Sequence, residues 1–305
     1  MIRLLKILIR LALWIFCNEI YIKNKSLLKE KGALLIIANH PNSFLDAIII
    51  GAQYNRRVFF LARGDVFNNK FNRTVLHFLN MIPVYRLREG KENLHLNEFA
   101  FTESIKLLSK GEAVLIFIEG ICLNTHILQP FKKGATRILE GAHKINIFPT
   151  IHVVGINYNN LRGPGKKINI VITKFFFKNQ IVNAKQKVLF NKEVFSILEK
   201  SIYPILVQPK HPILFLKNVL FYVGKCFYYI QSPYYFFIKN TVAKKTKNTV
   251  FFDSVLFAAL LLTYPFYLLL LFTILFLIRI PLPIIFITLV MTPIISKQYR
   301  LAQTN

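Results

Sequence analysis

Acidic residues are scarce in this sequence. Its 305 residues include 14 Asp and Glu against 40 Lys and Arg, which gives a formal net charge of +26 at pH 7. Charge of this sign attracts anionic lipid headgroups, phosphorylated substrates or nucleic acid. The sequence also lacks the helix-turn-helix, zinc-finger and RRM patterns of nucleic-acid-binding proteins. Because 54% of the residues are apolar, we expect membrane lipids, and no nucleic acid, among the partners.

Cysteine is rare as well. Cys17, Cys122 and Cys226 lie far apart, and their number is odd. This argues against a disulfide framework and against a cysteine-based zinc site, and it suits a reducing, cytoplasm-facing location. The histidines other than His40 show no metal-ligand spacing, so we expect no metal.

Apolar residues are concentrated near the C-terminus, beyond what a soluble domain hides from water. Ser254–Ile278 carries no charged side chain and is long enough to span a bilayer. The turn-like Ile280–Pro283 follows, and then a shorter apolar stretch, Ile284–Ile295. We predict a transmembrane helical hairpin and tail over residues 251–305, preceded by a basic, aromatic interfacial segment over residues 211–250.

Basic residues flank this hairpin, at positions 244, 245 and 247 before it and at 297 and 300 after it. Under the positive-inside rule, both ends lie on the cytoplasmic side. The sequence therefore predicts an integral membrane protein at the cytoplasmic face of the inner (plasma) membrane.

Residues 1–24 begin with basic and apolar residues but lack a small-residue cleavage site, so we expect them to be retained. Arg3, Lys6 and Arg10 fall on one side of a helix, with leucines and isoleucines elsewhere. This pattern predicts an interfacial helix that lies in the membrane surface. A helix that spans the membrane is the less favoured alternative.

Residues 25–210 are expected to form one α/β domain, with a mixed, largely parallel sheet flanked by helices, because short β-rich runs alternate with helical segments. The apolar character of the runs suggests strands buried on both faces. The expected strands are Ala33–Ala38, Val58–Ala62, Ala113–Ile118, Ile147–Val154 and Ile168–Thr173, and the expected helices are Ser43–Gln53, Phe71–Leu79, Asn93–Ser109 and Lys133–Ala142.

A candidate catalytic pair follows the first of these strands. His40 lies in the loop after it, and Asp46 lies in the first turn of the next helix. Transfer of an acyl group to an alcohol requires a base near neutral pH, which histidine supplies, and a carboxylate orients its ring. We interpret His40 as the base and Asp46 as its partner. The alternative is structural: Ser43–Asp46 also matches a capping box.

The same residues resemble a known family. Asn39–Ala47 is similar to the first sequence block of the glycerolipid acyltransferases, which include lysophosphatidate and glycerol-3-phosphate acyltransferases. Most members have four residues between His and Asp. This sequence has five, as in a branch that includes glycerol-3-phosphate/dihydroxyacetone-phosphate acyltransferases. The later blocks resemble Ile82–Arg86, Phe117–Gly120 with Phe131–Ala135, and Phe148–Ile151, in the family's order over about residues 33–160.

The resemblance implies roles for further residues. Arg86 would bind the phosphate of the acceptor, for which its planar fork is suited. Glu119 would hold an acceptor hydroxyl, and Gly120 would allow close approach of the backbone. Lys132 and Lys133 would attract phosphate from the acceptor or the donor. The acyl donor would be acyl-CoA or acyl-carrier protein, used as a substrate, so no cofactor is expected.

The third block departs from the family's Phe-Pro-Glu-Gly-Thr-Arg, because Ile118, Ile121 and Cys122 replace Pro, Thr and Arg. This leaves the acceptor open. We favour 1-acylglycerol 3-phosphate, a lyso-glycerophospholipid whose acylation gives phosphatidate in phospholipid synthesis. Glycerol 3-phosphate, dihydroxyacetone phosphate and a lyso-aminolipid are alternatives.

Two alternatives come from other classes. One is a catalytically inactive, membrane-tethered binding protein. The other is a metal-dependent hydrolase with His40, Asp46, Asp65 and Glu119 as ligands. None of the family blocks lies in the C-terminal hairpin, so we expect it to serve only as an anchor.

Overall fold

The computed structural model describes residues 2–85, 96–178, 180–202 and 214–303. Seven strands form one sheet in the order β1-β7-β6-β2-β5-β3-β4. The pairs are parallel except for β6 with β7, which is antiparallel. The predicted mixed, largely parallel sheet is therefore confirmed. The strands are β1 (Glu19–Lys23), β2 (Leu34–Ala38), β3 (Val58–Arg63), β4 (Met81–Val84), β5 (Ala113–Phe117), β6 (Thr150–Tyr158) and β7 (Lys167–Phe175).

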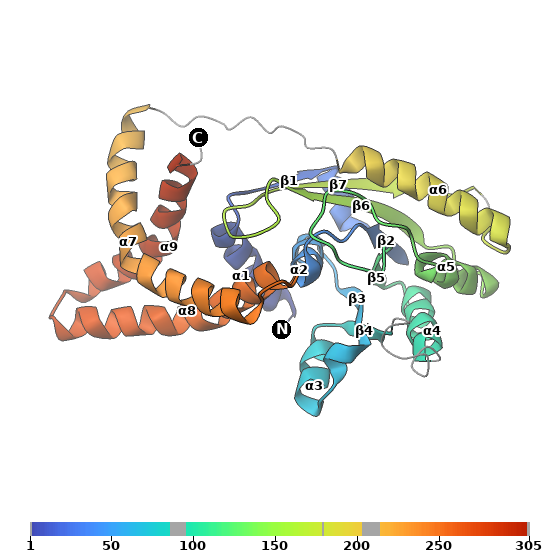
Figure 1. Cartoon of the computed structure of the whole chain (residues 1–305), viewed down its shortest axis with the longest axis horizontal. Coiled ribbons are helices and arrows are strands. Elements are labelled where there is room, and N and C mark those ends of the chain that lie inside the picture. The colour runs from blue at the N-terminus through green and yellow to red at the C-terminus, as the bar shows by residue number, and fades with distance from the viewer. Residues whose placement is uncertain (1, 86–95, 179, 203–213, 304–305) are drawn as a thin grey trace.

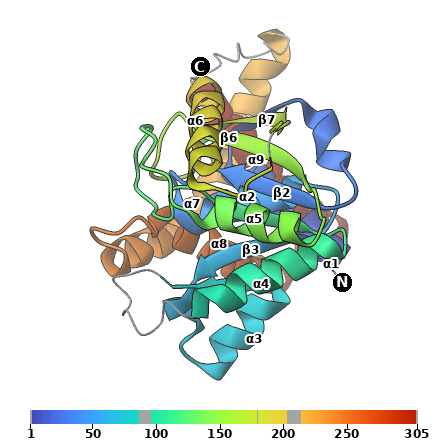
Figure 2. The same ribbon diagram turned by 90° about the vertical axis from the view of Figure 1, so that its right-hand side faces the viewer.

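Helices cover both faces of this sheet (Figures 1 and 2). One face packs against α4, α5 and α6 through a core that includes Phe101, Ile138 and Val194. The other packs against α1, α2 and the first turns of α8, through a core that includes Leu13, Ile49 and Leu256. The helices are α1 (Ile2–Phe16), α2 (Ser43–Gln53), α3 (Lys70–Phe78), α4 (Leu96–Ser109), α5 (Gly134–Lys144), α6 (Ala184–Ser201), α7 (Leu214–Lys245), α8 (Phe252–Leu277) and α9 (Leu282–Gln303).

The central strand β2 is fully buried along its length. Its residues Leu34–Ala38 pair with β5 on one side and with β6 on the other. A strand covered on both faces and paired on both edges needs apolar side chains at every position, which explains the unbroken apolar run in the sequence. The loop that carries His40 therefore begins at a fixed point in the middle of the sheet.

The N-terminal segment differs from the prediction in its extent. The helix ends at Phe16, and Glu19–Lys23 forms the edge strand β1, parallel to β7. The amides of Asn18 and Glu19 donate to the Lys166 carbonyl at 2.9 and 3.2 Å. A single interfacial helix over residues 1–24 is thus wrong, because the second half of that segment extends the sheet.

The basic side chains of α1 also lie differently from the expected arrangement. The Lys6 ammonium donates to the carbonyls of Gly51, Tyr54 and Arg56 at 2.9, 2.8 and 2.5 Å. Arg10 Nε donates to the Ala52 carbonyl at 2.6 Å. These carbonyls are at or just after the C-terminus of α2, where an α-helix leaves acceptors unpaired and where positive charge is favoured. The two side chains bind α2, while Leu4, Ile7, Leu8 and Leu11 of α1 are exposed.

The C-terminal helices lie to one side of the sheet (Figure 1). Residues 214–245, expected to be an interfacial segment, form the continuous helix α7, which packs against α8 and α9. Among the described residues, Phe252–Leu277 alone is long and apolar enough to cross a membrane by length and composition. The first residues of this helix are buried in the α/β domain, whereas Leu262, Phe266 and Leu277 farther along are largely exposed.

The contact between α1 and α2 yields a test. Lys6→Ala removes the donor that three α2 carbonyls share, so we expect a loss of about 1–3 kcal/mol in unfolding free energy. Thermal unfolding in detergent micelles measures it, with Lys192→Ala, an exposed lysine on α6, as the control. Equal melting temperatures for the two variants would contradict the contact.

Candidate active site

Three neighbouring parallel strands end close together and bring the candidate residues to one place. His40 follows the end of β2, Glu119 follows the end of β5, and Tyr158 is the last residue of β6. The carboxyl ends of parallel strands are where α/β sheets place functional groups. The order of strands therefore gathers side chains that are far apart in the sequence.

The predicted pair, His40 and Asp46, is in contact. His40 Nδ1 lies 2.9 Å from Asp46 Oδ2. An ionised carboxylate only accepts hydrogen bonds, so the shared proton belongs on Nδ1 and the lone pair on Nε2. Within the described part of the chain, no hydrogen bond reaches Nε2. This tautomer is the one that a general base requires.

The ring of His40 is also held by stacking. It lies on the ring of Phe117 with centroids 3.8 Å apart and an angle of 11° between the planes. The side chain of His40 keeps 17% of its surface exposed, whereas Asp46 is inaccessible. The imidazole is thus oriented from two sides and still open to a substrate.

Asp46 has two further donors. Its Oδ2 accepts from the Asn42 amide at 2.7 Å, and its Oδ1 accepts from the Tyr158 hydroxyl at 2.5 Å. The N-cap of α2 is Asn42, not Ser43. The bond from Asp46 back to this N-cap amide resembles one half of the capping box that we considered as an alternative. The same carboxylate caps the helix and contacts His40.

Glu119 lies beside this pair and is buried. Burial, together with the nearby charge of Asp46, raises the pKa of Glu119 from 4.5 to about 7, against opposing hydrogen bonds from the backbones of His40 and Gln129. A carboxyl group with this pKa is partly protonated at neutral pH, and its protonated form can donate a hydrogen bond. The site therefore contains a second buried carboxyl group, which can act as a donor.

Gly120 is in the left-handed region at φ 60°, and a Cβ there would lie 2.7 Å from Lys132 Cγ. Glycine is required both by the backbone conformation and by this contact. The aliphatic part of Lys132 is therefore what approaches Gly120. Lys132 and Lys133 are both exposed, just before α5.

Arg86 lies outside the described residues. The residue before it, Tyr85, is held by Asn97 of α4, whose side chain accepts from the Tyr85 amide at 2.7 Å and donates to its carbonyl at 2.8 Å. The ring of Tyr85 covers Gly64, where a Cβ would lie 2.2 Å from it. Tyr85, the last described residue of the second block, is therefore held in a fixed position.

Cys122, which replaces the family's arginine, has a structural contact. Its Sγ accepts from the Ser43 amide at 2.9 Å. Burial, the nearby Asp46 and the nearby Glu119 raise the pKa of Cys122 to about 12, against the opposing bond from Ser43. A protonated thiol is a poor nucleophile. In the part of the chain that the structure describes, no group of three or more His, Cys, Asp or Glu is placed to hold a metal ion.

Several residues of the site are not predicted from the sequence. Tyr158 lies 112 positions from Asp46, and Asn39 binds both the amide and the carbonyl of Ile156 at 2.8 and 2.9 Å. Asn39 and Asn42 stand inside the first block, so their polarity beside His40 was a usable signal. Tyr158 has no such signal, because only the pairing of β6 with β2 brings it to the site.

A comparison with known protein families identifies the class of the α/β domain. Residues 19–155 match the family model described as Acyltransferase, a stretch that contains His40, Asp46 and Glu119. The chain therefore contains an acyltransferase-family domain, as the motifs predict, and as an enzyme it is an O-acyltransferase.

The crystal structure of the 1-acyl-sn-glycerophosphate (LPA) acyltransferase PlsC from Thermotoga maritima is similar to this chain, with 16% identity and a TM-score of 0.47. The similarity covers 65% of this chain and 77% of that one. No curated protein matches this sequence significantly.

The contacts of Asp46 lead to a prediction. Asp46→Asn should lower turnover about 100-fold, since an amide no longer fixes the Nδ1–H tautomer of His40, and should cost about 1–3 kcal/mol of stability. Turnover and melting temperature are measured on the same preparation, with the exposed Glu98→Gln as control. Normal turnover with lowered stability would mean that Asp46 only caps the helix.

Glu119 predicts a dependence of stability on pH. Its pKa is raised in the folded state, so its contribution is complete below about pH 4.5 and is lost as the pH rises to about 7. The loss is about 3 kcal/mol. Melting temperatures between pH 4.5 and 8 should therefore fall more steeply for the wild type and Glu98→Gln than for Glu119→Gln. The same slope in all three proteins would contradict the assignment.

Proposed function

We propose that this enzyme transfers a fatty acyl group from a thioester, acyl-CoA or acyl-carrier protein, to the free hydroxyl of 1-acylglycerol 3-phosphate, forming phosphatidate. The observation that carries the proposal is the contact of His40 with the buried carboxylate of Asp46 at 2.9 Å. It supplies an oriented base at the carboxyl end of the central strand β2, with Nε2 available to a substrate.

The reaction proceeds by direct transfer. His40 Nε2 accepts the proton of the acceptor hydroxyl as that oxygen attacks the thioester carbonyl. The tetrahedral intermediate then collapses, the carbon–sulfur bond breaks, and the imidazolium returns the proton to the departing thiolate. Asp46 stabilises the imidazolium that forms between these steps. The products are an ester and a free thiol, and no cofactor is needed.

Glu119 is assigned to the acceptor. In its protonated form, which the raised pKa of Glu119 keeps populated near neutral pH, it donates a hydrogen bond to an oxygen of the glycerol backbone. Gly120 lets the chain turn sharply beside it, and Lys132 and Lys133 supply positive charge for phosphate. Arg86 is assigned to the phosphate of the acceptor, where its fork forms paired hydrogen bonds.

The replacement of the third-block arginine by Cys122 bears on the choice of acceptor. Cys122 is occupied with the Ser43 amide and offers no cation to a phosphate. Glycerol 3-phosphate, dihydroxyacetone phosphate and a lyso-aminolipid therefore stay as alternative acceptors. All are alcohols that the same base would activate.

The enzyme is proposed to work at the cytoplasmic face of the inner membrane. In support, α8 spans 26 residues, and the part beyond its buried start extends for roughly 30 Å, the thickness of a hydrocarbon core. The second arm of the proposed hairpin would be α9, which follows α8 in the chain and packs against both α7 and α8. The exposed apolar side chains of α1 also suit contact with the bilayer, although Lys6 and Arg10 are engaged with α2.

Product analysis tests this function. Purified protein is supplied with acyl-CoA or acyl-carrier protein and a panel of lyso-acceptors, and products are identified by mass spectrometry. We expect phosphatidate from 1-acylglycerol 3-phosphate, and at least a 1000-fold loss in His40→Ala, with that variant still folded and still associated with the membrane.

The controls separate the alternatives. Activity that disappears on chelation, with release of free fatty acid or phosphate, would favour a metal-dependent hydrolase. Binding of lipid with no product from any acceptor would favour an inactive binding protein. Wild-type turnover in His40→Ala would rule out His40 as the base.

A further inference from the structure

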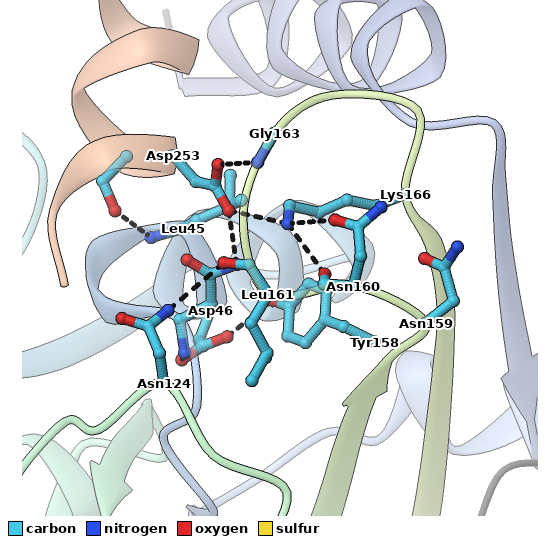
Figure 3. A network of polar contacts seen from close by, with 12 residues as sticks. Leu45, Asp46, Asn124, Tyr158, Asn159, Asn160, Leu161, Gly163, Lys166 and Asp253 are labelled. Atoms are coloured by element: carbon cyan, nitrogen blue, oxygen red, sulfur yellow. Dashed lines mark hydrogen bonds and ion pairs between the residues drawn. The ribbon is translucent and has the colours of Figure 1, made fainter. Parts of the chain in front are cut away.

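The start of α8 is built into the candidate active site. Phe252, Asp253 and Ser254 are all buried in the α/β domain. Asp253 is also the only acidic residue after Glu199 in the sequence. Figure 3 shows it between the loop that joins β6 to β7 and the start of α2. An acid at the head of an apolar helix is costly to bury without partners, so its contacts indicate what it does.

Asp253 binds three groups from two segments. Its Oδ2 lies 2.6 Å from the Lys166 ammonium and accepts from Asn42 Nδ2 at 2.9 Å, and its Oδ1 accepts from the Gly163 amide at 2.6 Å (Figure 3). Both charged side chains are inaccessible to solvent. Lys166 also donates to the carbonyl of Asn160 at 2.9 Å. The ion pair joins α8 to the β6–β7 loop, while the bond to Asn42 reaches the catalytic loop.

Ser254 supplies a second link to the same loop. Its Oγ accepts from the Leu45 amide at 3.0 Å. That amide is in the first turn of α2, where a helix has no internal acceptors, and the N-cap Asn42 makes no side-chain capping bond. The acceptor that the start of α2 requires therefore comes from another helix, more than two hundred residues later in the chain.

The two links flank a strained residue. Ser43 lies between Asn42 and Leu45 and has φ 52°, in the left-handed region that non-glycine residues rarely adopt. Such a conformation persists only where the surroundings determine it. Here Asn42 is held by Asp253, the Ser43 amide by Cys122, and the Leu45 amide by Ser254.

The link from Asp253 reaches the proposed base, His40, through Asn42 and Asp46. The Asn42 amide donates to Asp46 Oδ2, and the same oxygen accepts from His40 Nδ1. A displacement of α8 would move Asn42 and Leu45, and with them the carboxylate that orients the imidazole. The path from α8 to His40 consists of two hydrogen-bonded residues.

We propose that Asp253 and Ser254 are positioning residues, through which the seating of the apolar helix α8 sets the geometry of His40 and Asp46. The C-terminal segment is then part of the active architecture as well as an anchor. A truncation before Phe251 would remove both links, contrary to the expectation from the sequence that this segment serves only as an anchor. This inference rests on the proposed function for its kinetic test and on the hydrogen bonds alone for its spectroscopic test.

The kinetic test uses the smallest change. Ser254→Ala removes only the acceptor of the Leu45 amide, so we expect kcat to fall about tenfold or more while the KM values for donor and acceptor stay within about twofold. Ser254→Thr, which keeps the hydroxyl, should restore kcat. The matched control is Ser232→Ala in α7, where the hydroxyl donates to the Tyr229 carbonyl of its own helix at 3.1 Å. Carbonate extraction verifies that each variant stays membrane-bound.

The spectroscopic test needs no substrate. In protein with ¹⁵N-labelled histidine in micelles, the Nδ1–H proton of His40 should give a downfield signal protected by Asp46, assigned by its loss in His40→Gln. We expect it to broaden or vanish in Ser254→Ala and to persist in Ser254→Thr and Ser232→Ala. If the wild type acylates no acceptor, the proposed function fails, and this signal still decides the positioning role.

A wild-type kcat and an intact signal in Ser254→Ala would overturn the proposal, and so would a lower melting temperature with unchanged kcat. Should that variant not fold, the double variant Asp253→Asn with Lys166→Met decides. It removes both buried charges together and so avoids an unpaired charge. A lowered kcat with unchanged KM supports the proposal, and unchanged kcat overturns it.

Discussion

The arrangement of the candidate site depends on one buried carboxylate. Asp46 is inaccessible to solvent and accepts hydrogen bonds from the imidazole of His40, the amide of Asn42 and the hydroxyl of Tyr158. These donors come from the loop after β2, the start of α2 and the end of β6. A buried carboxylate with this many donors attracts each of them, so it fixes three segments relative to one another.

A second carboxyl group nearby behaves in the opposite way. Glu119 is buried with fewer compensating donors, and the charge of Asp46 repels its own, so its pKa is raised to about 7. The surroundings of Glu119 thereby favour its protonated form more than those of an ordinary carboxyl group. In the proposed reaction Asp46 stabilises a developing positive charge, and Glu119 offers a hydrogen bond to an acceptor oxygen. The charge of Asp46 is thus one of the causes of the raised pKa of Glu119.

Local patterns predicted much of this structure. The predicted bounds of Ser43–Gln53 agree with α2, and β2, β3, β5, β6 and β7 were expected because their apolar runs are continuous. The strands β1 and β4 were not predicted, since Glu19–Lys23 has charged ends and Met81–Val84 contains a proline. Each is recognisable as a strand only from its pairing, β1 with β7 and β4 with β3. His40 and Asp46 are six positions apart, within reach of motif analysis. The contacts of Asp46 with Tyr158 and of Asn42 with Asp253 join positions 112 and 211 apart, which no local pattern encodes.

In the proposed membrane arrangement, the junction of α8 with the α/β domain also limits how this protein adapts to a lipid bilayer. A membrane helix usually adjusts to hydrocarbon thickness by sliding or tilting. A slide by one residue turns a helix about 100°, which would put Phe252 or Val255 where Asp253 and Ser254 now meet their partners. The start of α8 is therefore fixed in depth and rotation, and any adjustment falls to its far end, near the turn at Arg279, where φ is 60°. In that arrangement, a change in bilayer thickness would tilt or bend α8 about its fixed start, which lies beside the candidate active site.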